Sequence, residues 1–326
     1  MRAHRGLSRQ RGIALLVAIV MFAIATTVAA AITYNKAMAA RRAAATFTME
    51  QALQAGMAAE ALAAVALENA GGKPKTELTQ DWAQVQPPLE IEGTGIWVQA
   101  QVEDLQGRFN LNSVVTWDQQ NNTFVPDLHQ ISIFRTLLQD LDIDPGYADL
   151  LVDWIDPDIA PSSNSGGGGE DTLYLTQTPS YRPPNTFITH PSELLALPKF
   201  GRENYQKIAP YVTALPVDVA VNLCTASALV LNTTRNDPQN QTEFADETLK
   251  QARQNGCFPA TTNVYSGVIA NPQIRAEVEK RIDLKSSWFR LRTNIRIGTA
   301  EFVLYSVLFR EPGNKVRTVQ RSFGSE

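Results

Sequence analysis

Apolar and polar positions divide the chain into regions with three different patterns. An uncharged apolar run extends from Ile13 to Ile32, and about 20 such residues suffice to cross a bilayer as a helix. The chain then continues to Ala70 without proline and is rich in strong helix formers, so we predict one helix from Ile13 to Ala70. In its second half we expect the larger apolar side chains to face a core and the polar ones to face water. The core set is Leu53, Met57, Leu62, Val65 and Ala66, and the solvated set is Glu50, Gln54, Glu60 and Glu68.

Strict alternation of apolar and polar residues marks four segments as half-buried strands. The first is Gly95–Glu103, and the others are Trp288–Ile297, Glu301–Phe309 and Lys315–Phe323. Short turns separate the last three, which is typical of an antiparallel meander. We therefore predict that the strand near residue 100 and the three C-terminal strands form one antiparallel sheet, which packs on the long helix.

Helical periodicity dominates the intervening residues, roughly 112–283, which predicts a mainly helical domain inserted between strands of an α+β fold. The expected organisation is a leader (1–12), a membrane-spanning part (13–35), the helix with the first strands (36–111), the insert (112–283) and the C-terminal strands (284–326). The expected helices are Ile131–Leu141, Tyr147–Ile155, Ser192–Leu197, Glu203–Val212, Ala226–Leu231, Phe244–Asn255 and Pro272–Ile282.

The N-terminal apolar run is compatible with three kinds of processing. Four arginines precede it, which places the N-terminus in the cytoplasm and the rest of the chain across the membrane. The run could be an uncut signal anchor, or a secretory signal cleaved at the small residues Ala29–Ala31. A third possibility is a prepilin-type leader cleaved between Gly12 and Ile13, which would keep the apolar helix in the mature protein. The absence of a helix breaker between residues 33 and 40 favours this third interpretation.

Net charge, cysteine content and histidine content bear on which classes of protein the chain can belong to. The 326-residue chain has a formal net charge of -4, which argues against a nucleic-acid groove. Its two cysteines, Cys224 and Cys257, follow the apolar run, so an oxidising compartment favours their pairing; two buried free thiols are the alternative. With three histidines and no nucleophile-elbow motif, the sequence does not indicate an enzyme.

An acidic cluster is the main candidate for site chemistry. It comprises Asp153, Asp156 and Asp158, followed after a Ser/Gly tract by Glu170 and Asp171. Calcium prefers several hard oxygen ligands in flexible geometry, and a fold of the Gly166–Gly169 run would bring the second pair onto the first. We therefore predict a calcium site. Helix capping or a solvated acidic loop would equally account for these residues.

Four motifs resemble the general secretion pathway K proteins, the large minor pseudopilins of type II secretion systems. They are D-L-Q-G-R-F-N-L-N (104–112), D-W-I-D-P-D (153–158), G-E-D (169–171) and V-N-L-C-T-A (221–226). The resemblance implies a pilin-like fold with a helical insert, inner-membrane insertion with the head in the periplasm, and cleavage and N-methylation at Ile13 by prepilin peptidase. The implied partners are the minor pseudopilins I and J, then H and the major pseudopilin, and exported proteins. Calcium binding is also implied.

Two further features bear on that role. The fifth residue after the expected cleavage point is Val17, where most pilin-like subunits carry a glutamate thought to meet a neighbour's amine. A buried charge needs such a partner, so Val17 suits a subunit at the end of a filament. Separately, residues 192–208 resemble a helix-hairpin-helix unit, and the alternative function is a DNA- or protein-binding minor pilin. Only Lys199, Arg202 and Lys207 are basic there, so we expect protein contacts and no nucleic acid.

Overall fold

A single continuous helix, α1 (Arg11–Gly71), opens the computed structural model, and the chain separates into two compact units at residues 55 and 56. The structure describes residues 11–157, 161, 169–235, 246–254, 256–258, 269 and 271–324. Within that part of the chain, α1 alone is long and apolar enough to cross a membrane, in its portion that starts at Ile13. The helix predicted from Ile13 to Ala70 is therefore confirmed, with its observed end one residue later, at Gly71. Most of the expected leader lies outside the described residues.

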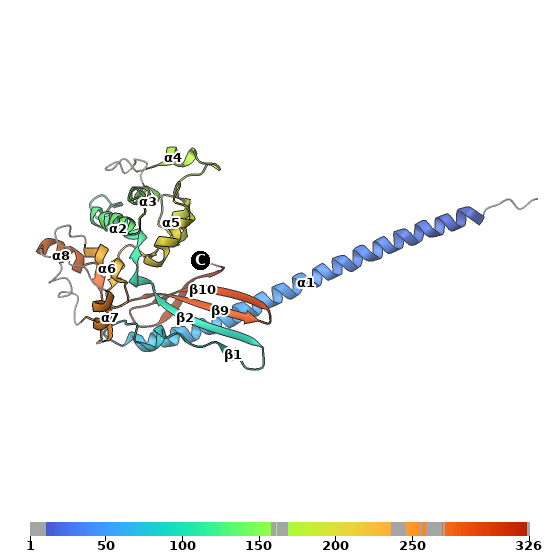
Figure 1. Ribbon diagram of the computed structural model, residues 1–326, viewed down its shortest axis with the longest axis horizontal. Coiled ribbons are helices and arrows are strands. Elements are labelled where there is room, and N and C mark those ends of the chain that lie inside the picture. The colour runs from blue at the N-terminus through green and yellow to red at the C-terminus, as the bar shows by residue number, and fades with distance from the viewer. Residues whose placement is uncertain are drawn as a thin grey trace, which may run out of the picture. The chain divides into compact units, whose positions relative to one another are not determined.

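Five antiparallel strands form one sheet in the unit that spans residues 56–326 (Figure 1). The predicted sharing of one sheet by strands from both ends of this unit is confirmed. Strand β2 pairs with β9 over its whole length, with Trp97 opposite Arg296, and β9 pairs with β10. In sheet order the strands are β1 (Leu89–Ile91), β2 (Ile96–Asp104), β9 (Trp288–Ile297), β10 (Ala300–Arg310) and β11 (Val316–Phe323).

The last turns of α1 pack on this sheet through small residues. The predicted helix faces are partly wrong: Glu50 and Gln54 are exposed and Ala66 contacts the core as predicted, but other positions are reversed. Leu62 is 69% exposed and Val65 55% exposed, whereas Glu60 is only 5% exposed. A Cβ on Gly56 would lie 2.4 Å from Leu304 Cδ2, so the helix approaches the sheet more closely than large side chains allow. Apart from Glu60 and Leu67, the residues buried on this face of the helix are small. They include Gly56, Ala59, Ala63 and Ala70.

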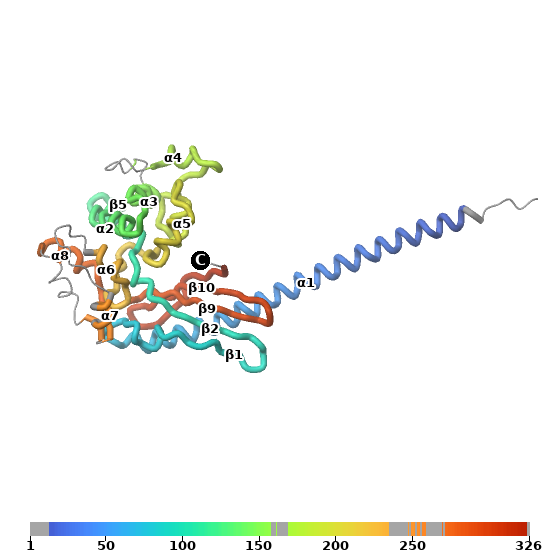
Figure 2. The backbone as a smooth tube through the Cα atoms, in the orientation of Figure 1, coloured from blue at the N-terminus to red at the C-terminus, as the bar shows by residue number. Residues whose placement is uncertain are grey.

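The chain leaves the sheet after β2 and returns at β9, and the intervening residues form the inserted helical domain (Figure 2). Its helices are α2 (Leu128–Asp140), α3 (Tyr147–Ile155), α4 (Asp171–Leu175), α5 (Gly201–Ile208), α6 (Ala228–Arg235), α7 (Asp246–Gln254) and α8 (Pro272–Glu279). In Figure 1 the helices α2, α3 and α5 lie on the side of the sheet opposite to the last turns of α1, whereas α7 lies at the end of the sheet beside the end of α1. Short 3-10 helices are η1 (Asp81–Ala83), η2 (Leu105–Gly107), η3 (Leu111–Val114), η4 (Pro191–Ala196) and η5 (Ala209–Tyr211).

Short strand pairs in the insert were not predicted from periodicity. They are the hairpin β4 (Val115–Asp118) with β5 (Thr123–Pro126), and the parallel pairs β3 (Phe109–Asn110) with β6 (Val212–Thr213) and β7 (Val221–Asn222) with β8 (Ile282–Asp283). Three predicted helices also differ. The helix predicted over Pro272–Ile282 ends at Glu279, and Ile282 begins β8. The segment 192–197 is a 3-10 helix, and the helix predicted to reach Val212 ends at Ile208 because Pro210 breaks the hydrogen-bond ladder and β6 follows.

Two hydrophobic clusters stabilise the insert. The larger one is built around α2 and α3 with Phe109, Phe134 and Leu151, and the smaller one joins α6 to α8 through Val230 and Val278. Beside the smaller cluster, Cys224 and Cys257 form a disulfide with a Cα–Cα distance of 5.6 Å. This bond ties the turn before α6 to the turn after α7.

Candidate functional site

The motif D-L-Q-G-R-F-N-L-N begins with a buried carboxylate that joins the sheet to the insert. Asp104 ends β2 and is 8% exposed. Its Oδ2 accepts hydrogen bonds from Ser286 Oγ (2.5 Å), Thr225 Oγ1 (2.6 Å) and Asn222 Nδ2 (2.9 Å), and its Oδ1 accepts one from Gln106 N. Burial raises the pKa of Asp104 although these donors oppose the shift. The motifs 104–112 and 221–226, which carry the family resemblance, are therefore in direct contact through the hydrogen bonds of Asp104.

The two asparagines of the same motif hold extended segments of the insert through their backbone groups. Asn112 Nδ2 donates to Ile188 O and Leu215 O, both at 2.9 Å, and its Oδ1 accepts from Ile188 N. Asn110 Oδ1 accepts from Leu215 N, and its Nδ2 donates to Pro216 O at 2.7 Å. Buried backbone groups need such partners when no sheet is available, so these motif residues have an architectural role.

The predicted acidic cluster is partly assembled. Carboxylate oxygens of Asp153, Asp156 and Glu170 lie within 4.8 Å of one another, and the three residues are 0%, 2% and 6% exposed. Asp153 lies in the last turn of α3, Asp156 follows that helix, and Glu170 immediately precedes α4. Three carboxylates this close in a buried setting repel one another unless protons, hydrogen bonds or a cation compensate.

Gly169 and Tyr174 complete the surroundings of this cluster. Gly169 N donates to Asp153 Oδ2 at 2.5 Å, and a Cβ at this glycine would lie 2.1 Å from Leu173 Cδ2. Tyr174 is fully buried, and its hydroxyl has no hydrogen-bond partner in the described part of the chain. Burial raises the pKa of Tyr174, and the charges of Tyr181, Asp153 and Glu170 raise it further. The phenol therefore stays protonated and available as a donor near the carboxylates.

Of the other two predicted ligands, Asp171 does not join this group. Asp171 is the first residue of α4, its side chain is 46% exposed, and it forms an ion pair with Arg182 at 3.5 Å. Asp158 lies outside the described residues. Hard carboxylate oxygens are the donors that calcium prefers, and they supply part of the six to eight that it takes. The donor set of Asp153, Asp156 and Glu170 therefore fits a calcium ion.

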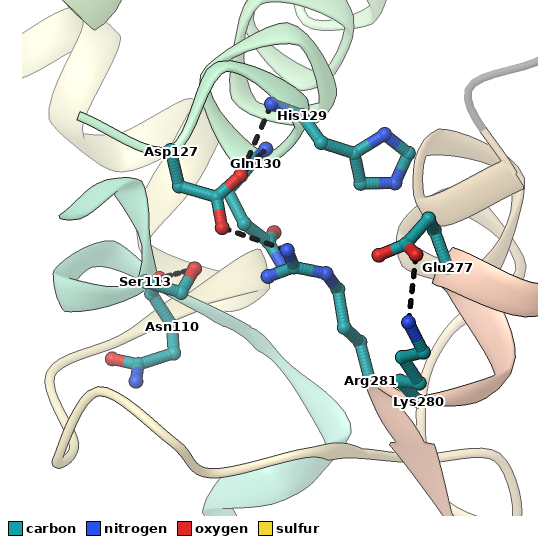
Figure 3. A network of polar contacts seen from close by, with 8 residues as sticks. All are labelled: Asn110, Ser113, Asp127, His129, Gln130, Glu277, Lys280 and Arg281. Carbon is teal, nitrogen blue, oxygen red and sulfur yellow. Dashed lines mark hydrogen bonds and ion pairs between the residues drawn. The ribbon is translucent and has the colours of Figure 1, made fainter. Parts of the chain in front are cut away.

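A second polar cluster, which we did not predict from the sequence, links α2 to α8 beside a cavity of about 290 Å³ (Figure 3). Asp127 caps α2 by accepting from His129 N and Gln130 N, and it also accepts from Arg281 Nη2 at 2.7 Å. The pKa of His129 is lowered by burial and by the charge of Arg281. An aspartate directly before an apolar helix is a capping signal, so the cap was foreseeable from sequence, but its ion pair with Arg281, which lies between α8 and β8, was not.

The helix-hairpin-helix-like segment lies within the insert and consists of η4, a short turn and α5. His190 caps η4 together with Glu193, and Phe200 is buried against the ring of Tyr147 at 4.9 Å. Lys199 and Gly201 both have positive φ, 62° and 72°, in the turn that leads to α5. The turn contains one glycine, Gly201, and its Phe200 is buried in the insert, so the segment contributes to the packing of the insert.

The same inserted region matches a family model described as type II secretion system (T2SS) protein K, over residues 107–217. Over 332 residues the chain is 30% identical to the type II secretion system protein K of Pectobacterium carotovorum subsp. carotovorum, covering 97% of each chain. The chain belongs to the type II secretion system protein K family.

Further comparisons agree with this assignment. The protein K of Pseudomonas aeruginosa is 29% identical, with 97% of this chain and 93% of that protein covered. A chain in the crystal structure of the GspK-GspI-GspJ complex from enterotoxigenic Escherichia coli superimposes with a TM-score of 0.71 at 19% identity, covering 87% of this chain and all of that one. The fold is thus the pilin-like α+β fold of protein K, and the relatives are named as components of a secretion system.

Proposed function

We propose that this member of the protein K family is a minor pseudopilin at the tip of the type II secretion pseudopilus. In this role it primes filament assembly together with the I and J minor pseudopilins, so that folded proteins are exported across the outer membrane. The observation that carries the proposal is the combination of one apolar N-terminal span with a protein K head that resembles its relatives over nearly the whole chain. The head would lie in the periplasm and the arginine-rich N-terminus in the cytoplasm.

The outer face of α1 supports docking of partner helices. Met57 is 40% exposed, Leu62 69% and Val65 55%, and the exposed positions between them are Ala58 and Ala61. An uncharged apolar stripe of this kind marks an interaction surface. Because the opposite face of these turns is already buried on the sheet, the stripe is available to the I and J subunits. Val17 leaves the span without a carboxylate for a further subunit, which favours a terminal position.

The test combines processing with assembly. The protein is purified from membranes of a host with active prepilin peptidase and with tagged I and J subunits. We expect a mature chain that begins with N-methylated Ile13 and co-purifies with both subunits. Leu62→Glu should reduce that co-purification, whereas Leu89→Glu, at a residue of similar exposure on β1, should not. A chain that begins after Ala31, or that retains its leader, would contradict the pseudopilin role.

We also propose that Asp153, Asp156 and Glu170 hold a calcium ion that fixes the start of α4 to the end of α3. The ion would neutralise three buried carboxylates, and Tyr174 and the N–H of Gly169 would orient them. We expect millimolar calcium, and not magnesium, to raise the unfolding temperature of the wild-type protein, because calcium accepts flexible ligand geometry whereas magnesium requires near-octahedral geometry.

Substitutions distinguish calcium binding at this site from non-specific calcium binding to an acidic loop. Asp153→Asn or Glu170→Gln should abolish the calcium-dependent rise. Asp171→Asn is the matched control, because Asp171 follows Glu170 directly but pairs with Arg182 outside the cluster. An equal calcium response in all three variants would show that binding, if any, occurs elsewhere.

A further inference from the structure

An open edge of the sheet lies at β11. In the described part of the chain this strand pairs only with β10, and its side chains from Val319 to Ser322 are exposed. An edge strand offers a row of backbone N–H and C=O groups to any extended segment that can lie beside it. At its start, the amide of Val316 is already occupied by Glu68 Oε1 at 2.9 Å. The opposite edge strand, β1, has only three residues, so β11 is the longer free template.

An apolar groove of about 930 Å³ lies beside this edge, between the sheet and the insert. Tyr305 and Val307 line it from β10, and Val319 lines it from β11. The insert contributes an aromatic wall in which Phe124 contacts Trp117 at 4.9 Å and Phe187 at 4.8 Å between ring centroids. Clefts of this size commonly hold ligand groups in mostly apolar surroundings. We name β11 and this groove together the β11 groove.

Positive charge is concentrated on the same strands. Residues 288–324 contain seven basic and two acidic residues, although the whole chain has a net charge of -4. Arg310 is buried, Arg317 pairs with Glu311 and Arg321 pairs with Glu60. The exposed basic side chains outside these pairs are Arg292, Arg296 and Lys315. Glu103 is shared between Arg108 (2.9 Å) and Arg290 (2.6 Å), so one carboxylate serves two guanidinium groups at the groove. Arg292 is exposed on the same face of β9, between Gln101 and Tyr305.

We propose that the β11 groove binds an extended acidic segment of a partner protein, which adds a strand to β11 and places an apolar side chain against the aromatic wall. Backbone pairing gives affinity in this mode, and the flanking pocket and charges give specificity. The excess of arginine selects acidic segments and disfavours a second copy of this chain, because two β11 edges would bring like charges together. This site does not depend on the filament role proposed above.

The experiment measures binding to the full-length protein in detergent micelles. The probe is a fluorescein-labelled peptide of about eight residues, a usual strand length, with alternating glutamate and valine and one central phenylalanine. We expect saturable anisotropy with a Kd tighter than about 1 mM, the weak end of specific recognition, and no binding of the same peptide with lysine in place of glutamate. Absence of saturation, or equal binding of the lysine peptide, would overturn the proposal.

Two matched pairs of variants locate the site. Arg292→Glu should weaken binding by at least about threefold, the effect of one exposed ion pair, whereas Lys250→Glu, at an exposed residue of α7, should not. A photo-crosslinking residue at Val319 should capture the peptide, and one at Leu89 on β1 should not. Equal capture at both edges, a crosslink between two copies of the chain, or displacement of the peptide by duplex DNA would each refute an acidic protein segment as the occupant.

Discussion

Glu60 is the residue at which the packing of α1 on the sheet can be tested most directly. It is 5% exposed, and its two carboxylate oxygens accept hydrogen bonds from Ser306 Oγ (2.6 Å), Thr318 Oγ1 (3.1 Å) and the Arg321 guanidinium (2.7 Å at the shortest). These groups lie on β10 and β11, so one side chain connects the helix to two strands. Replacing it changes the attachment of helix to sheet without creating a large cavity.

The cost of Glu60→Ala follows from the fate of its partners. Ser306 is fully buried and would lose its acceptor, whereas the Arg321 side chain is 43% exposed and can be rehydrated. The buried hydroxyl of Ser306 would have lost its acceptor, and the charge-assisted hydrogen bonds would be lost as well. Together these effects predict a loss of about 2–3 kcal/mol in the free energy of unfolding. Glu60→Gln keeps the shape and some acceptor capacity, so we expect a loss of about 1–2 kcal/mol.

The pH dependence provides a second readout. Burial alone would raise the pKa of Glu60, but the hydrogen bonds from Arg321, Ser306 and Thr318 lower it below its ordinary value of 4.5. A carboxylate whose pKa is lower in the folded state stabilises the fold above its unfolded pKa, and this contribution is lost as the pH falls. The stability difference between the wild type and Glu60→Gln should therefore be present at neutral pH and shrink below pH 4.5.

The assay is urea unfolding of the full chain in detergent micelles, followed by tryptophan fluorescence. Trp82 is 4% exposed and packs edge-on against Phe289 of β9, so its emission reports the helix–sheet core. Glu50→Gln, at an exposed glutamate of the same helix, is the control and should change stability by less than about 0.5 kcal/mol. If Glu60→Gln cost no more than this control, or if its effect did not diminish in acid, the inferred anchoring role of Glu60 would be wrong.

Three further outcomes are expected. Because burial raises the pKa of Asp104 above 3.8, its contribution to stability is lost as the pH rises, so Asp104→Asn should become relatively more stable with increasing pH in parallel urea titrations; a constant difference would contradict this. The denatured, unreduced protein should show no free thiols, and Cys224→Ser should cost about 4 kcal/mol, because the bond with Cys257 closes a loop of 33 residues; a full complement of reactive thiols would disprove the pairing. Gly12→Leu should leave the leader attached, and an unchanged mature mass would count against prepilin processing.

Local sequence patterns were sufficient to predict most of the regular elements. The long helix was predicted from its helix-forming composition and the lack of proline up to Ala70, and β2 and β9–β11 were predicted from strict alternation. These signals are local because backbone propensity and burial on one face repeat at a fixed period along the chain. The acidic residues near Asp153 were apparent as a cluster of carboxylates, and the motif around Asp104 was noted through its resemblance to a known family.

The faces of α1 could not be read in the same way. Hydrophobicity predicted Leu62 and Val65 in the core and Glu60 in water, and the structure reverses both assignments. Close approach of the helix to the sheet requires small residues such as Gly56, and the buried glutamate is tolerated because Arg321, 261 positions later in the chain, supplies its partner. Neither condition is visible in the local pattern.

The sequence by itself thus determined the apolar N-terminal segment, the long helix, the strands β2 and β9–β11, the presence of a helical insert and the resemblance to a secretion family. Only the tertiary structure decided which polar residues act together. Asp104 meets Thr225 and Ser286, Asp153 meets Glu170 but not Asp171, and β11 becomes an open edge beside an aromatic groove. The physical reason is that such contacts join residues distant in sequence, and their geometry depends on how closely whole elements pack.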